Sequence, residues 1–209
     1  TVNISPVSNA GTDGSTTVCE NSTTAINLFD LITGEQTGGV WTRTSGTGGT
    51  FTAASATFVP TSATNSTFTY TITGTSPCPD DSSLATVNVN AVANAGTDGN
   101  TTICVDATAA VNLFSLITGE QTGGVWTRTS GVGGTFNATT GTFTSSLGAT
   151  TSQFKYTVAG SAPCLDDFSM ATININEVPN AGTDGTLTIC ETSTTTINLA
   201  DILLGEQSG

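Results

Sequence analysis

The sequence predicts an all-β protein made of tandem antiparallel β-sandwiches, on three observations. Threonine and valine, whose branched side chains favour extended backbone, are abundant, whereas long runs of Glu, Lys, Leu and Ala are absent. Short alternations of apolar and polar residues recur between clusters of turn residues, as in strands with one buried face. The whole pattern repeats with a period longer than the ~20–50 residues of solenoid units, which indicates a repeat of domain size.

Two exact motifs mark the repeat. The hexapeptide NAGTDG stands at residues 9–14, 94–99 and 180–185. The segment GEQTGGVWTRTSG at 34–46 recurs letter for letter at 119–131. We therefore expect the chain to be a window of a longer array. Its expected segments are 1–8 (last strand of a preceding repeat), 9–93 (repeat 1), 94–179 (repeat 2) and 180–209 (first part of a truncated repeat 3).

In chain order, each repeat predicts a series of short extended segments. In repeat 1 they are STTVC, TTAINL, GGVWTRTS, GTFTAASATFV, STFTYTITG and SLATVNVNAV. In the fifth of these, Phe68, Tyr70 and Ile72 alternate with threonines, so one face of the strand is expected to be buried. The exception is NLFDLITG at 27–34, where an Asn start, an apolar cluster and a closing Gly predict one or two helical turns.

Charge and composition exclude several kinds of partner. The 209 residues include 3 Lys or Arg, 16 Asp or Glu and no His, for a net charge of −13. Nucleic acid and anionic lipid both require clustered Lys and Arg, so neither is an expected partner. No apolar run in this window approaches the ~20 residues of a membrane-spanning helix. The weakly charged surface, rich in Thr, Ser, Asn and Gly, favours an extracellular or cell-surface location.

The residues needed for common catalytic arrangements are missing from this window. Without histidine and with Lys155 as the one lysine, Ser/His/Asp and Cys/His arrangements cannot form. The paired acids Asp80–Asp81 and Asp166–Asp167 are adjacent, so they do not face each other across the ~5–9 Å gap of a glycosidase. The chain is therefore expected not to be an enzyme.

The ordered motifs NAGTDG…TVCEN…INL…VWTRTSG…ATF…FTYTITG…ATVNVN resemble those of PKD-like, immunoglobulin-like domains. The closest likeness is to the tandem, cysteine-containing versions found in large surface adhesins of Bacteroidetes, which are typically exported by the type IX system. The resemblance covers the whole chain and implies immunoglobulin-like sandwiches in a linear array. Such domains serve as spacers, filaments and binders, so the likeness alone does not assign a function.

The identical segment is interpreted as a structural part of this fold. Trp41 stands where the third strand of immunoglobulin-like sandwiches carries a core Trp, and Arg43 faces the same side of the strand. We expect the Arg43 guanidinium to pair with a carboxylate at the sandwich edge, with Glu35 and Asp30 as candidates. The predicted core structural residues are Trp41, Trp126, Tyr70, Tyr156, Arg43 and Arg128.

The cysteines occupy two repeated positions. Cys19, Cys104 and Cys190 share one of them, and Cys78 and Cys164 share the other. The absence of CxxC and of His favours disulfides over metal binding. One pairing lies within repeats, Cys19–Cys78 and Cys104–Cys164. The other joins successive repeats, Cys19–Cys164, because an immunoglobulin-like strand order separates Cys19 from Cys78 by more than ~20 Å. Both pairings remain open at this stage.

Calcium is the one cofactor to consider. Carboxylate oxygens bind Ca²⁺, but EF-hand spacing is absent, and Asp-Gly is also ordinary turn chemistry. The calcium candidates are Asp13, Asp98, Asp80, Asp81, Asp166 and Asp167.

The sequence favours a structural array that forms the stalk or filament of an extracellular bacterial adhesin. Short linkers and disulfides would make it rigid. Its expected partners are neighbouring repeats of the same chain and identical chains in a fibre. Two alternatives are a multivalent module that binds polysaccharide or ice, and a self-assembling multi-chain filament.

Overall fold

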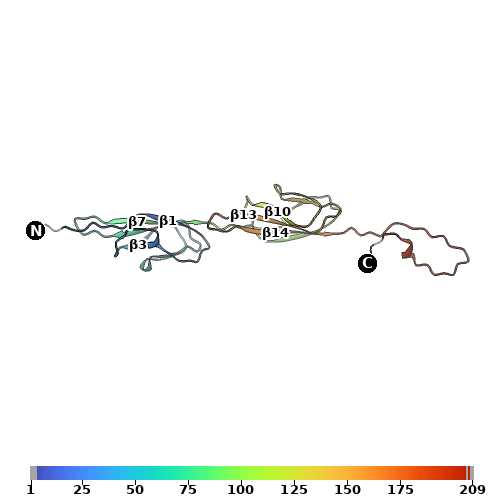
Figure 1. Ribbon diagram of the computed structural model, residues 1–209, viewed down its shortest axis with the longest axis horizontal. Coiled ribbons are helices and arrows are strands. Elements are labelled where there is room, and N and C mark those ends of the chain that lie inside the picture. The colour runs from blue at the N-terminus through green and yellow to red at the C-terminus, as the bar shows by residue number, and fades with distance from the viewer. Residues whose placement is uncertain (1–3, 206, 208–209) are drawn as a thin grey trace. The chain divides into compact units, whose positions relative to one another are not determined.

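The computed structural model describes residues 4–205 and 207 (Figure 1). The first series of elements is β1 (Gly14–Cys19), β2 (Ile26–Asn27), η1 (Leu28–Asp30), β3 (Val40–Ser45), β4 (Thr50–Thr52), η2 (Ala53–Ser55), β5 (Thr57–Val59), β6 (Ser66–Ile72) and β7 (Asp81–Asn90). The second series is β8 (Gly99–Cys104), β9 (Val111–Asn112), η3 (Leu113–Ser115), β10 (Val125–Ser130), β11 (Thr135–Asn137), β12 (Thr142–Thr144), β13 (Ser152–Val158) and β14 (Asp167–Asn176), followed by η4 (Leu199–Ile202).

The strands form two pairs of sheets with the same order. In the first sandwich, a sheet ordered β1-β7-β6-β3 is paired with a sheet ordered β2-β5-β4. In the second, β10-β13-β14-β8 is paired with β11-β12-β9. The predicted all-β fold with immunoglobulin-like sandwiches is confirmed. Among the described residues, no helix is long and apolar enough to cross a membrane.

One edge of each four-stranded sheet departs from the antiparallel expectation. Strand β1 runs parallel to β7, with Gly14 opposite Ala85 and Cys19 opposite Asn90. Strand β8 runs parallel to β14 in the same way. The reason lies before β1, where the NAGTDG segment is hydrogen-bonded to the first residues of β7, so both strands start at the same end of the sandwich.

The chain divides into two compact units. The first comprises residues up to Thr97 together with Gly119–Val125 and Tyr156–Ser169, and the second contains the rest. The repeat boundaries at 9–93 and 94–179 stay a prediction. The strand expected at 1–8 falls partly on residues outside the described ones, and residues 4–8 form no regular element. Glu206, Ser208 and Gly209 of the predicted truncated repeat also lie outside the described residues.

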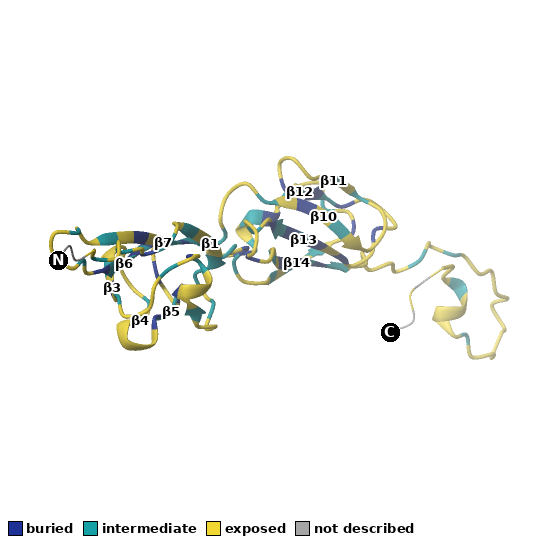
Figure 2. Cartoon of the chain, turned by 60° about the vertical axis from the view of Figure 1, so that its left-hand side comes forward, coloured by how far each residue is buried: buried dark blue, intermediate teal, exposed yellow. Residues whose placement is uncertain are grey.

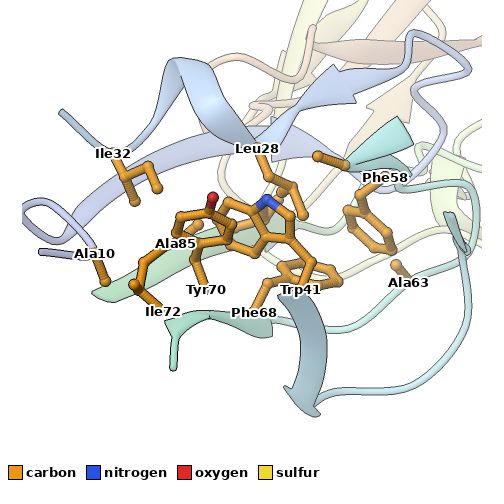
Figure 3. Packing of buried hydrophobic residues seen from close by; sticks show 12 residues of the cluster. Ala10, Leu28, Ile32, Trp41, Phe58, Ala63, Phe68, Tyr70, Ile72 and Ala85 are labelled. Carbon is orange, nitrogen blue, oxygen red and sulfur yellow. The ribbon is translucent and has the colours of Figure 1, made fainter. Parts of the chain in front are cut away.

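The core of the first sandwich follows from strand periodicity. Along β6, buried and half-buried positions alternate (Figure 2). Because successive side chains of a strand face opposite sides, Phe68, Tyr70 and Ile72 share the buried side. They meet Phe58 from β5 and Trp41 from β3, and Figure 3 shows these rings packed together. The ring centroids of Phe58 and Phe68 are 4.8 Å apart. Such aromatic pairs add about 0.5–1.5 kcal/mol beyond the burial of their area.

The helical turn expected at 27–34 is a short 3₁₀ helix. Asn27 caps it, because its side-chain oxygen accepts a hydrogen bond from the Phe29 backbone N–H at 3.2 Å. Leu28 is fully buried on the inner side of this turn. The turn therefore adds an apolar side chain to the core of the first sandwich.

Candidate functional site

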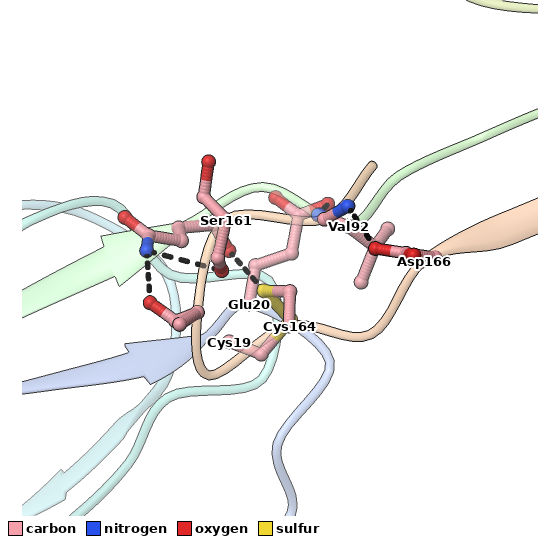
Figure 4. The surroundings of a disulfide bond; sticks show 9 residues. Cys19, Glu20, Val92, Ser161, Cys164 and Asp166 are labelled. Atoms are coloured by element: carbon pink, nitrogen blue, oxygen red, sulfur yellow. Dashed lines mark hydrogen bonds between the residues drawn. A yellow bond between two sulfur atoms is a disulfide. The ribbon is translucent and has the colours of Figure 1, made fainter. Parts of the chain in front are cut away.

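The chemically distinctive site is the disulfide between Cys19 and Cys164 (Figure 4). Cys19 is the last residue of β1, and Cys164 lies in the connection between β13 and β14. Their Cα atoms are 5.2 Å apart, and 145 positions of sequence separate them. Both cysteines belong to the first compact unit.

Asn90, at the end of β7, organises the surroundings of this disulfide. The parallel register places Asn90 opposite Cys19. Its side-chain amide donates to the carbonyls of Ser161 at 3.3 Å and Ala162 at 2.8 Å, just before Cys164. The Asn90 carbonyl accepts the Glu20 backbone N–H at 2.9 Å. One residue thus holds the end of β1 and the β13–β14 connection in place.

The same connection geometry occurs between β6 and β7. The Cys164 N–H donates to the Ser161 carbonyl at 2.9 Å, and the Cys78 N–H donates to the Thr75 carbonyl at 2.9 Å. In each connection a carboxylate, Asp166 or Asp80, accepts a backbone N–H from a glycine. The two connections are therefore built alike, although only one of them forms the disulfide with Cys19.

The structure distinguishes the two pairings left open by the sequence. Cys19–Cys164 is present, whereas Cys78, Cys104 and Cys190 are free thiols. The pairings Cys19–Cys78 and Cys104–Cys164 are therefore absent from this part of the chain. The physical reason is the length of β7. Cys19 lies beside the end of β7, whereas Cys78 precedes its first residue, and a strand of this length spans about 30 Å.

The calcium candidates all accept backbone N–H groups. Asp81 accepts from Ala10 at 2.7 Å, and Asp13 accepts from Leu84 at 2.8 Å. The remaining contacts are Asp167 with Ala95, Asp98 with Met170, Asp80 with Gly74 and Asp166 with Gly160. Within residues 4–205 and 207, no group of three or more His, Cys, Asp or Glu side chains could hold a metal ion. These contacts favour the interpretation as turn and strand-end residues.

The two repeated motifs bind each other, which sequence reasoning missed. The Asn9 backbone N–H donates to the Gln36 side-chain oxygen at 3.1 Å, and the Gln36 N–H donates to the Asn9 carbonyl at 2.9 Å. Asn94 with Gln121, and Asn180 with Gln207, make the same two bonds. The equal spacing of Asn and Gln in all three copies was the available signal.

Tyr70 connects the identical segment to the core. Its hydroxyl donates to the Gln36 carbonyl at 2.8 Å and accepts the Gly39 N–H at 2.9 Å. A Cβ atom at Gly39 would lie 2.5 Å from the Tyr70 ring, so only glycine fits there. In the second sandwich, Tyr156 makes the corresponding bonds to Gln121 and Gly124. Gly39 and Gly124 therefore leave room for the tyrosine rings, whose hydroxyls bond the backbone of the identical segment.

Trp41 and Trp126 are buried. Trp41 is 4% exposed and packs edge-on against the Phe29 ring, with centroids 5.5 Å apart. A buried indole offers no surface on which a sugar ring could stack.

The prediction that the Arg43 guanidinium pairs with a carboxylate is wrong. The guanidinium donates instead to the carbonyls of Ser45 at 3.2 Å and Gly48 at 2.6 Å, and to the Ser66 hydroxyl at 2.7 Å. Its central carbon lies 5.1 Å from the centroid of the Phe58 ring. An irregularity in β3 between Arg43 and Ser45 brings the loop carbonyls within reach. Arg128 makes the corresponding contacts with Ser130, Gly133, Ser152 and Phe143.

No protein-family model and no curated protein matches the chain. Among solved structures, the chain is similar to human protocadherin-24 EC1-2, with 12% identity over 85% of this chain and 100% of that chain and a TM-score of 0.44. A titin I-band fragment, I67-I69, is 12% identical over 88% of this chain and 70% of its own, with a TM-score of 0.39. The insect immune protein hemolin is 13% identical over 87% and 53%, with a TM-score of 0.36. Likenesses this distant assign no function.

Proposed function

We propose that the chain is a non-enzymatic structural part of an extracellular protein, the stalk or filament of a bacterial surface adhesin. The observation that carries this proposal is the Cys19–Cys164 disulfide, which joins the end of β1 in one sequence repeat to the β13–β14 connection of the next. Neighbouring repeats of the same chain, and identical chains in a fibre, are its proposed partners. The resemblance to PKD-like repeats of Bacteroidetes adhesins supports the same function.

The disulfide gives this role a physical basis. A force applied through the two ends of the chain cannot extend the segment between Cys19 and Cys164 while the bond is intact. Extended chain spans at most ~3.3–3.6 Å per residue, so a separation of 145 residues would otherwise release about 500 Å of length. The bond therefore limits lengthening under load even if the sandwiches lose their packing.

The distinctive residues support a non-enzymatic role because structural contacts occupy them. Arg43 bonds to loop carbonyls, Tyr70 bonds to the Gln36 carbonyl, and Asp81 accepts the Ala10 N–H of the segment before β1. Trp41 is buried, which argues against a row of exposed aromatic rings for polysaccharide or ice. Disulfides persist in oxidising compartments, so the bond also supports an extracellular location.

Immunogold electron microscopy of intact cells tests the proposal. Antibodies against residues 9–179 should label appendages or the cell surface without permeabilisation. An antibody against a known cytoplasmic protein serves as the control for leakage. Label that appears only after permeabilisation would refute the extracellular role. The same images distinguish single stalks from multi-chain fibres.

A further inference from the structure

Cys104 occupies in the second sandwich the position that Cys19 holds in the first. It is the last residue of β8 and lies opposite Asn176 of β14, as Cys19 lies opposite Asn90 of β7. Its side chain is exposed and its thiol is free. Cys104 therefore has the backbone setting of a disulfide-bonded cysteine without the partner.

Cys78 has the complementary setting, that of Cys164. Its Sγ atom donates to the Ser5 carbonyl at 3.8 Å, while the Sγ of Cys164 lies 3.3 Å from the Asn90 carbonyl oxygen. Ser5 and Asn90 are equivalent in the aligned segments TVNIS and TVNVN. The connection that carries Cys78 thus lies against the preceding segment as the connection that carries Cys164 lies against β7. Within the described residues, Cys78 has no disulfide partner.

We propose that Cys78 and Cys104 are sites for further disulfides of the Cys19–Cys164 type. Cys78 bonds to a cysteine at the β1-end position of another repeat, and Cys104 bonds to a cysteine in the corresponding strand connection of another repeat. That repeat belongs either to the same polypeptide or to a second copy of the chain. The inference rests on the repeat organisation used in the proposed function.

The bond forms by thiol–disulfide exchange with a small disulfide such as oxidised glutathione. One cysteine loses its proton, its thiolate attacks the small disulfide, and one glutathione thiolate leaves. The second cysteine also loses its proton, attacks the resulting mixed disulfide and releases the second glutathione thiolate, and the two thiolates take up the two protons. Two protein thiols are oxidised, and the small disulfide accepts the two electrons. The exposed Cys104 and the half-buried Cys78 are both accessible to such a reagent.

The first test is peptide mapping of the native protein, digested with pepsin without reduction after free thiols are blocked. The peptide that contains Cys78 should be linked to a peptide with a cysteine of the β1-end type. A linked peptide from around Cys104 or Cys190, in a species that separates on reduction, identifies a second copy. A linked sequence from outside residues 1–209 in an undivided chain identifies a repeat of the same polypeptide. Cys78 and Cys104 recovered as free thiols would overturn the proposal.

The second test asks whether copies pair by position. In a Cys190→Ser background, Cys78→Ser and Cys104→Ser variants are incubated with oxidised glutathione, alone and mixed. If copies are the source, the mixture forms at least ten times more disulfide-linked dimer than either variant alone. Equal dimer in either variant alone would show unspecific thiol oxidation and refute pairing between copies. If the mixture forms no dimer, the partner cysteine must belong to another repeat of the same polypeptide. The peptide map must then show a linked sequence from outside residues 1–209. Neither result depends on where antibodies label the cell.

Discussion

Removing the Cys19–Cys164 disulfide should destabilise the protein strongly, whereas removing the equivalent free cysteine should not. The experiment starts from a background in which Cys78, Cys104 and Cys190 are serine, so that only one disulfide can form. Cys19→Ser in this background removes the bond. The matched control restores Cys104, which holds the same strand position in the second sandwich and is unpaired.

The magnitude follows from chain entropy. For a closed loop of 145 residues, the entropy model predicts a stabilisation of about 5 kcal/mol. If one sandwich unfolds while the other stays folded, the flexible part of the loop is roughly halved, which lowers the figure by only about 0.6 kcal/mol. Because measured values fall below the model, we expect a loss of about 2–4 kcal/mol.

Urea titration followed by tryptophan fluorescence measures this loss. Trp126→Phe leaves Trp41 as the reporter of the first sandwich, and Trp41→Phe leaves Trp126 for the second. The midpoint should fall by about 1–2 M urea in Cys19→Ser, while the control should stay within about 0.5 kcal/mol of the background. If Cys19→Ser unfolded together with the background, the loop-closure argument would be refuted.

Three further predictions concern the disulfide under load and the hydrogen bonds of Tyr70 and Arg43 in the first sandwich. Pulling the chain by its ends should extend it about 500 Å further when the Cys19–Cys164 bond is reduced, measured by optical tweezers; equal extension with and without reductant would contradict it. Tyr70→Phe should lower the free energy of unfolding by about 1–3 kcal/mol, because the Gly39 N–H loses its acceptor; a change below 0.5 kcal/mol by urea titration would show that water replaces the hydroxyl. Arg43→Met keeps the apolar stem but leaves loop carbonyls unpaired, so the free energy of unfolding should fall by about 1–3 kcal/mol in the same titration. Unchanged stability would mean that these hydrogen bonds make no net contribution.

The fold could be predicted from local sequence patterns because the alternation of apolar and polar residues within each strand indicates its buried face. The alternation of Phe68, Tyr70 and Ile72 with threonines sets which face is buried, whatever the neighbouring strand. The parallel edge strand was not readable in this way. It depends on which end of the sandwich the chain enters. That end is fixed by two hydrogen bonds across 71 positions of sequence, which the Ala10 N–H donates to Asp81 and the Leu84 N–H donates to Asp13.

The contacts of the site were harder to predict for the same reason. The strand phase places Arg43 toward the core side, but its hydrogen-bond partners depend on a loop whose carbonyls point inward. The acidic composition predicts a carboxylate partner, but the Asp30 carboxylate accepts a hydrogen bond from the Asn27 side chain. The sequence left the disulfide pairing open because the pairing depends on the length of β7, which separates the two cysteine positions of a repeat. That length can only be estimated from the sequence.

The placement of the cysteines has a consequence for an array of any length. The two cysteine positions of one repeat lie at opposite ends of its last strand, about 30 Å apart, so a repeat cannot close a disulfide on itself. Every bond of the Cys19–Cys164 type therefore needs two repeats, and in the proposed array each added repeat would use one free thiol and supply another. Such an array always keeps one unpaired cysteine of each kind, at opposite ends. Covalent growth of the proposed array would be directional, because a cysteine at the β1-end position would pair only with a cysteine in the strand connection of another repeat.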